Sequence, residues 1–252
     1  MTLVAGGMFV FSRIGGLLMA MPVLGASGIP VQARLAVAVP LSLLLLPSAG
    51  QVPLPATLSA LLGGIISEVV LGLLMGFCMQ VVYAALGVAA DLASTQAGLQ
   101  LAGMVDPVTM AQPGVLGVLV TWLGAGVFLG ADMHLFCLTT LGSSFHEVPP
   151  GAVTMALGGA EGLVRLSGTM LLTSVQLAAP LTVFVFSVNL AMSILGRMAP
   201  GQQFFFAVGT TLHVVAGLAL LTLALPAMLR VWVDLLPTGL EAMMQAVHLA
   251  GG

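Results

Sequence analysis

Long apolar blocks separated by proline-containing breaks constrain the fold of this chain more than any other feature. Only 5% of the residues are charged, and 60% are hydrophobic. A water-soluble domain has too little interior to bury uncharged runs of this length, which belong in lipid or in large protein–protein interfaces. The sequence therefore predicts an all-α integral membrane protein, with residues 1–252 forming one domain. About six hydrophobic helical segments are expected, at residues 3–24, 35–46, 56–90, 115–141, 162–195 and 204–225.

The C-terminal residues 227–249 differ from these blocks. They mix Arg230, Asp234 and Glu241 with methionine, leucine and valine, a pattern typical of an amphipathic helix. At the other end of the chain, no lysine or arginine precedes the first apolar run. A cleaved signal peptide has a positive segment there, so we expect the first block to be retained.

The block lengths do not suit a plain bundle of spanning helices. A hydrocarbon core of roughly 30 Å is crossed by about 20 helical residues. Residues 35–46 are too few for this, whereas residues 56–90, at about 1.5 Å per residue, would form a rod of roughly 50 Å. We therefore expect some helices to bend as hairpins, or to leave the lipid and pack against other protein.

Glycines recur at spacings of four or eight residues in two of the blocks. Such positions share one helix face and let helix backbones approach closely in a membrane. Packing within the chain explains this pattern at least as well as contact with another subunit. The predicted packing glycines are Gly64, Gly72, Gly76, Gly126 and Gly130.

Arg13, Glu68 and Arg197 stand within or at the ends of apolar runs, where a charge facing lipid is costly. We predict structural roles for all three, with Arg13 and Glu68 paired with each other or with partner subunits. A proton or ion relay is the functional alternative for Glu68. A relay needs several titratable groups within reach, and the acids of this chain are scattered, so a structural ion pair is favoured.

No motif of a catalytic, cofactor or metal site is present. The patterns HExxH and GxSxG and a phosphate-binding loop are all missing from the sequence. Cys78 and Cys137 lie in separate apolar stretches without metal-ligand spacing, so both are predicted to be buried thiols. The net charge is −3 and the sequence has no cluster of basic residues, so nothing in it indicates nucleic-acid binding. The chain is predicted not to be an enzyme and to carry no cofactor.

Six short motifs follow one another along most of the chain. They are RIGGLLMAMP (13–22), GIPVQARL (28–35), EVVLGLLMGF (68–77), GLQLAGMVDP (98–107), His134 with Ser144-Phe145 and Pro149-Pro150-Gly151, and NLAMSILGRMAP (189–200). In this order they resemble the R-type export-gate subunits of flagellar and type III secretion systems, the FliR/SctT family. The forms Asp106-Pro107 and Arg197-Met-Ala-Pro200 favour the flagellar branch over a virulence injectisome.

The resemblance implies a role that composition cannot reveal. An R-type subunit joins P-type and Q-type (FliP-like and FliQ-like) subunits in a closed, ring-like assembly of helical hairpins in the inner membrane, at the flagellar basal body. Unfolded export substrates pass through its centre. An FlhB-like switch protein and an FlhA-like channel are implied as further partners, together with the lipid bilayer.

The resemblance also implies that the loop at residues 98–114 plugs the pore. A hydrophobic constriction blocks water and ions by dewetting, and flexible methionines can seal it and part. Leu101 and Met104 stand where the family often has phenylalanine, which argues against aromatic gating but not against plugging. Gly201 likewise displaces the glutamine that usually follows the arginine–proline turn. The predicted plug residues are Leu101, Met104, Val105, Asp106, Pro107 and Met110.

A stand-alone secondary transporter or channel is the main alternative. Short helices interrupted by proline, together with a buried Glu68, would suit a substrate site at the membrane midplane. Against this, the chain has no repeated halves and few polar groups with which to bind a solute. A scaffold without a pore loop is a further alternative, and an intramembrane enzyme is the weakest.

Overall fold

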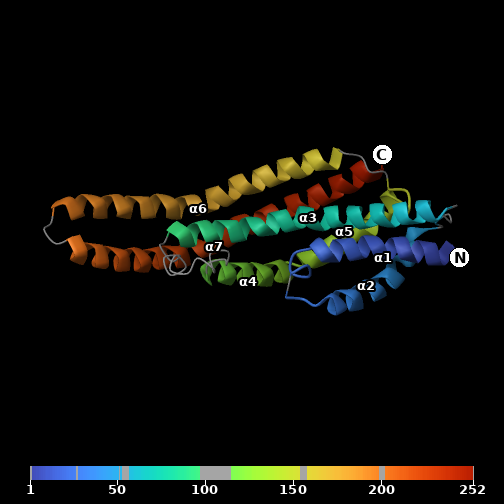
Figure 1. Ribbon diagram of the computed structural model, residues 1–252, viewed down its shortest axis with the longest axis horizontal. Helices are drawn as coiled ribbons and strands as arrows, with labels where there is room; N and C mark the ends of the chain where they lie inside the picture. The colour runs from blue at the N-terminus through green and yellow to red at the C-terminus, as the bar shows by residue number, and fades with distance from the viewer. Residues whose placement is uncertain are drawn as a thin grey trace. The chain divides into compact units, whose positions relative to one another are not determined.

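A computed structural model describes residues 2–26, 28–50, 52, 57–96, 115–153, 158–198 and 202–251. All regular structure in these ranges is helical, which confirms the all-α class (Figure 1). By length and composition, three apolar helical stretches within the described ranges could cross a membrane: Val31–Ala49, Leu58–Leu92 and Gly217–Gly251. The elements are α1 (Thr2–Ala20), α2 (Val31–Leu45), the 3-10 helix η1 (Leu46–Ala49), α3 (Leu58–Gln96), α4 (Val115–Gly130), α5 (Met133–Glu147), α6 (Gly158–Met198) and α7 (Gln202–Gly251).

The prediction that the second block is too short to span a membrane was wrong. η1 continues α2 without a break, and together they form an apolar stretch of 19 residues. Pro40 lies inside α2, and Pro47 lies in the first turn of η1. Proline has no backbone N–H. At the start of a helical turn this N–H would have no intrahelical partner, so a proline there does not interrupt the helical run.

The predicted block 115–141 is two helices. α4 ends at Gly130, α5 begins at Met133, and their axes differ by 58°. Asp132 adopts a left-handed conformation (φ 56°) at the bend, which aspartate tolerates better than most residues. The pair is the kind of bent segment that the block lengths predicted, and it counts as one further candidate span.

The predicted division between residues 204–225 and 227–249 was also wrong, because α7 runs unbroken for 50 residues. Pro226 and Pro237 lie inside it. In an apolar environment an unpaired backbone group is costly, so a helix there persists through proline more readily than it does in water. The predicted amphipathic character is confirmed, since Trp232, Leu236 and Met243 are buried. The exposed polar residues of this segment are Arg230, Asp234, Glu241, Gln245 and His248.

The chain forms two compact units. Unit 1 comprises Met1–Tyr83, Val127–Gly168 and Leu235–Gly252, and unit 2 comprises Ala84–Gly126 and Thr169–Asp234. α3, α4, α6 and α7 each contribute to both units, so the chain passes between the units within continuous helices. The assignment of residues 1–252 to a single export-gate domain stays a prediction.

Unit 1 has its core where α1, the first part of α3, α5 and the end of α7 bury apolar side chains. Gly239 lets α7 approach α3 closely, because a β-carbon there would lie 2.8 Å from Met79 Sδ. Tyr83 and Phe128 meet edge to face with ring centroids 6.0 Å apart. The buried core residues include Phe9, Ile14, Leu17, Met75, Met79, Leu141, Phe145, Leu236 and Met243.

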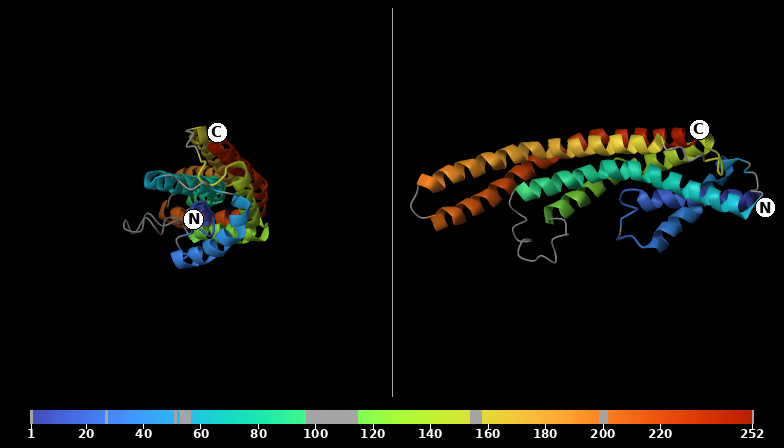
Figure 2. Two further views of the ribbon diagram at one scale, coloured as in Figure 1. Left: turned by 90° about the vertical axis from the view of Figure 1, so that its right-hand side faces the viewer. Right: turned by 45° about the horizontal axis from the view of Figure 1, so that its top comes forward.

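Unit 2 contains the remaining parts of α3, α6 and α7 together with most of α4. Within this unit α6 and α7 run side by side over most of their length (Figures 1 and 2). α3 and α4 also pack closely. A β-carbon on Gly117 of α4 would collide with the carboxylate of Asp91 in α3. Val120 and Trp232 are buried here.

Candidate functional site

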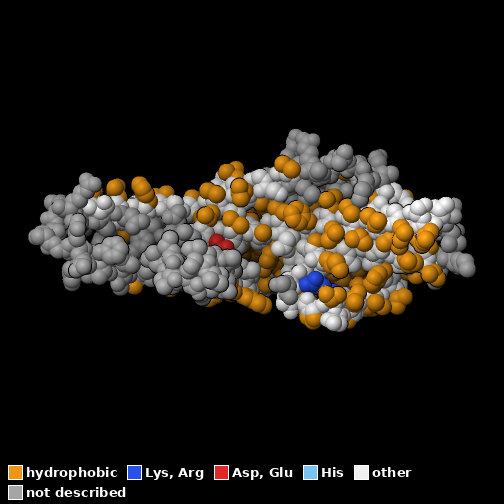
Figure 3. Space-filling model, viewed as in Figure 1, with side chains coloured by type: hydrophobic (Ala, Val, Ile, Leu, Met, Phe, Trp, Pro, Cys, Tyr) orange, Lys and Arg blue, Asp and Glu red, His pale blue; other side chains and the backbone are white. Residues whose placement is uncertain are grey.

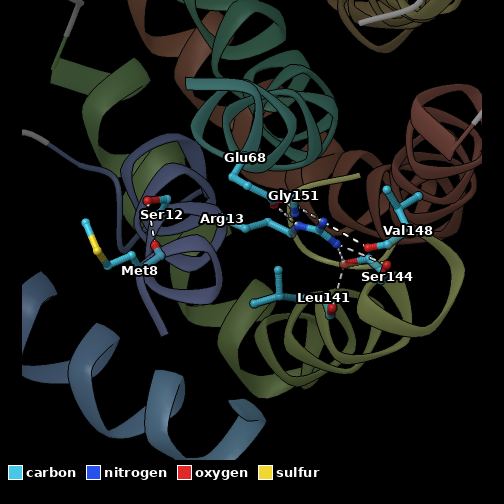
Figure 4. Close-up of polar contacts among 8 residues, drawn as sticks. All are labelled: Met8, Ser12, Arg13, Glu68, Leu141, Ser144, Val148 and Gly151. Carbon is cyan, nitrogen blue, oxygen red and sulfur yellow. Dashed lines mark hydrogen bonds and ion pairs between the residues drawn. The ribbon is translucent and has the colours of Figure 1, made fainter. Parts of the chain in front are cut away.

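Arg13 is fully buried in α1 and forms an ion pair with the fully buried Glu68 of α3. The guanidinium binds the carboxylate through two hydrogen bonds (Figure 4). Nε donates to Oε2 at 2.6 Å, and Nη2 donates to Oε1 at 3.1 Å. This parallel geometry is the strong, directional form of an arginine–carboxylate contact. The structure thus brings together two charges that lie 55 residues apart in the sequence.

The remaining donors of Arg13 bind the end of α5. Nη1 donates to the carbonyl oxygen of Ser144 at 3.0 Å and to its Oγ at 3.1 Å, while Nη2 donates to Val148 O at 3.0 Å. A helix leaves its last carbonyls without intrahelical partners, and its C-terminus favours a positive charge. Arg13 therefore caps α5 and neutralises Glu68 with the same group. With five donors and five bonds, its hydrogen-bonding capacity is filled.

The turn after α5 completes this cluster. Gly151 N donates to Glu68 Oε1 at 2.8 Å, and Ser144 Oγ donates to Leu141 O at 2.7 Å. Gly151 has φ +84°, a conformation that side chains rarely adopt, so glycine suits this position. We call Arg13, Glu68, Ser144, Val148 and Gly151 the arginine junction. It connects α1, α3 and the end of α5 through one buried set of polar bonds.

Two aromatic rings cover the arginine junction. The Arg13 guanidinium lies 4.5 Å from the centroid of the Phe145 ring, within the range of a cation–π contact. Phe9 fills the space between α3 and the turn after α5. A β-carbon on Gly64 would lie 2.7 Å from its Cε1, and one on Gly151 would lie 3.0 Å from its Cε2. These rings exclude water, which strengthens the polar bonds that they enclose.

Apart from Gly64, which lies against Phe9, the predicted packing glycines divide into two groups. Gly72 and Gly76 lie directly against the α1 backbone: a β-carbon on Gly76 would lie 2.8 Å from Leu17 O, and that of Gly72 would collide with Arg13 O. This approach brings the base of Arg13 next to Glu68. Gly126 and Gly130 differ, because apart from the neighbouring backbone of the same helix no atom in the described part of the chain lies within 4 Å of where their β-carbons would be.

The arginine junction holds one acid and one base rather than a series of titratable groups. Within the described ranges, the Glu68 carboxylate is bound by Arg13 and Gly151 alone. In the same ranges no cluster of three or more histidine, cysteine, aspartate or glutamate side chains could hold a metal ion. This arrangement can fix the relative positions of α1, α3 and the end of α5.

Other predicted residues lie elsewhere or outside the described ranges. Arg197 is in the last turn of α6, and its side chain is not among those described. Cys78 and Cys137 are free and buried, as predicted. All the predicted plug residues, Leu101, Met104, Val105, Asp106, Pro107 and Met110, fall outside the described ranges.

Sequence reasoning missed the partners of the ion pair near α5. Ser144 and Val148 contribute mainly backbone carbonyls, which any residue type carries, so no side-chain pattern identifies them. The motif Pro149-Pro150-Gly151 contained one available signal, because a glycine after two prolines permits an unusual backbone conformation.

Comparison with known proteins agrees with the motifs. A family model for bacterial export proteins, family 1, matches residues 4–238. The flagellar biosynthetic protein FliR of Caulobacter vibrioides is 32% identical over 227 residues, covering 89% of this chain and 90% of that protein. FliR of Escherichia coli is 28% identical, covering 85% and 82%, and FliR of Bacillus subtilis is 23% identical, covering 97% and 95%. The chain is thus a member of family 1 of the bacterial export proteins, the FliR/SctT family that its motifs predicted.

Proposed function

We propose that this chain is the R-type subunit of the export gate of the flagellar type III protein export apparatus, in the bacterial inner membrane at the basal body. The observation that carries the proposal is the family match, which extends over residues 4–238. Relatives aligned along nearly their whole length are flagellar biosynthetic proteins, which favours the flagellar branch over an injectisome. The apolar helices supply the membrane segments that such a subunit needs.

The arginine junction supports a structural rather than a catalytic role. An asymmetric subunit in a ring has to present fixed surfaces to different neighbours, namely FliP-like and FliQ-like subunits and an FlhB-like switch protein. A buried, fully satisfied polar cluster specifies one relative arrangement of α1, α3 and α5, because any other arrangement leaves charges unpaired. We propose that the cluster prepares this part of the chain for assembly.

A solitary transporter is disfavoured by the same geometry. Glu68 was the residue that suited a midplane substrate site, and its carboxylate is enclosed and bound by Arg13. A solute would have to displace a buried guanidinium that is bonded to α3 and to the end of α5 before it could reach that carboxylate.

Copurification tests the proposed function directly. The chain would be co-expressed with the P-type and Q-type subunits of the same genome, purified through a tag on this chain, and weighed by native mass spectrometry. We expect one copy of this chain in a larger mixed complex. If both candidate partners express well and the chain purifies as a monomer or homo-oligomer, the export-gate proposal is wrong.

Deleting residues 104–110 is expected to leave assembly intact and to raise ion conductance through the gate. The physical reason is that an apolar constriction excludes ions only while its side chains are present. Replacing the same residues with a glycine–serine segment of equal length is the matched control, since it keeps the loop length and removes the seal. We expect raised ion conductance through the gate in both variants. An assembled gate with unchanged conductance in both would contradict a plug at Met104–Met110.

A further inference from the structure

α2 with η1 is apolar around nearly its whole circumference. Within α2, only Ala38 and Ser42 are buried, and the hydroxyl of Ser42 donates to Ala38 O at 2.6 Å inside the helix. Successive residues of a helix are about 100° apart, so these two side chains, four residues apart, define a single narrow strip. The exposed aliphatic side chains of α2 are Val31, Leu35, Val37, Val39, Leu43 and Leu44.

Arg34 is the one charged residue of α2, and it lies in the first turn. Its Nη2 donates to Gly25 O at 3.1 Å and to Ala26 O at 2.6 Å, which fixes the guanidinium against the loop before the helix. In the described ranges the buried Nε has no hydrogen-bond partner, and no carboxylate pairs with Arg34. Val31 and Leu35 beside it are exposed.

We propose that α2 and η1 lie in the hydrocarbon of the bilayer and that Arg34 binds the phosphate of an anionic lipid headgroup at its boundary. A helix that is hydrophobic all round is stable only when apolar material surrounds it. The 19 residues of Val31–Ala49 extend about 28 Å at about 1.5 Å per residue, close to the thickness of a hydrocarbon core. Arg34 then lies near the headgroup level.

The charge of Arg34 favours lipid over an apolar protein segment as the material around this helix. A guanidinium donates well to the oxygens of a phosphate. Nη2 is occupied by Gly25 O and Ala26 O and Nε is buried, which leaves Nη1 without a hydrogen bond to any described residue and able to donate to a phosphate. An apolar helix of a partner subunit would cover the aliphatic side chains but would supply no anion. Lipid supplies both the acyl chains and the phosphate. Figure 3 shows a small group of basic atoms next to apolar side chains on the face drawn there.

Lipid-specific quenching tests the position of α2 in the assembled complex. A bimane label on Leu44→Cys, which is 72% exposed, would be compared with one on Ala38→Cys, which is 2% exposed. The native Cys78 and Cys137 are buried and give little background. In nanodiscs with bromine-labelled phospholipids we expect strong quenching at position 44 and weak quenching at position 38. A label at position 44 that no brominated lipid quenches would mean that a partner subunit covers α2, and the proposal would fail.

Retained lipids test Arg34 separately. The complex would be exchanged into nanodiscs of phosphatidylglycerol and phosphatidylcholine, released, and weighed by native mass spectrometry. We expect Arg34→Gln to lose a retained phosphatidylglycerol, whereas Arg34→Lys and the control Arg230→Gln keep it. Equal retention in Arg34→Gln and the unmodified protein would overturn the phosphate contact, even if α2 proved to lie in lipid. Neither measurement depends on secretion, so failure here is distinguishable from failure of the export role.

Discussion

Arg13→Leu is expected to lower the free energy of unfolding by about 3–5 kcal/mol, the usual cost of removing one partner of a buried ion pair. Glu68 would keep the hydrogen bond from Gly151 but would lose its counter-charge in a site with no exposure to water. The end of α5 would also lose its cap. We therefore expect the yield of assembled complexes to fall much more than the secretion per assembled complex.

Three further variants test whether Arg13 stabilises the fold through the whole arginine junction or only through its ion pair with Glu68. Arg13→Lys keeps the charge, but its ammonium has three donors and cannot reach Glu68, Ser144 and Val148 together. Exchange of the two charges, Arg13→Glu with Glu68→Arg, should also fail, because a glutamate cannot donate to the α5 carbonyls. Arg13→Leu combined with Glu68→Leu should cost less than the sum of the single changes, because no charge then remains unpaired.

The yield of complexes and their activity must be measured separately. Complexes would be counted through a tag on a partner subunit, and secretion would be divided by that count. Arg13 and Glu68 variants that assemble normally but stop secretion would contradict a structural role and would favour a proton relay through Glu68.

The second large effect is expected for Gly72→Ala, which should lower the free energy of unfolding by about 1–3 kcal/mol through overpacking. The added β-carbon would collide with Arg13 O and would lie 2.9 Å from Leu17 N. Both are backbone atoms, so α1 and α3 would have to move apart. That movement would lengthen the Arg13–Glu68 bonds, which adds to the cost of the collision itself.

Gly63→Ala is the matched control in the same helix. Apart from the neighbouring backbone of α3 itself, no atom in the described part of the chain lies within 4 Å of where its β-carbon would be. Alanine is a better helix former than glycine by about 1 kcal/mol, so this variant should be neutral or slightly stabilised. Thermal unfolding in mild detergent, followed by circular dichroism, measures both. Equal unfolding temperatures for the two variants would show that the close approach of α1 and α3 is unimportant.

Several features were predictable because they depend on composition and local spacing. The scarcity of charge determines an apolar environment, and apolar runs in such an environment become helices because no water satisfies the backbone. The glycine spacing in residues 64–76 indicates a face for close packing, and Gly72 and Gly76 lie against α1. The isolation of Arg13 and Glu68 indicated interior charges, since a lone charge facing lipid is costly.

Other features were not predictable because they depend on what each segment meets. The same small-residue spacing gave close packing at Gly72 but no contact at Gly126 with another helix in the described part of the chain. The spacing shows that a helix face allows close approach, but it does not show which helix packs there. Helix ends were misplaced at Pro47 and Pro226 because proline removes one bond, and the surroundings decide whether the helix continues.

The sequence alone determined that this chain is an all-α membrane protein of the bacterial export family, with Arg13 and Glu68 as interior charges. Those properties follow from residue types and their order. Only the tertiary structure decided that Arg13 also caps α5 and that Gly151 completes the shell of Glu68. The reason is physical: these contacts use backbone carbonyls and an N–H that almost every residue possesses, so their partners are selected by position in space.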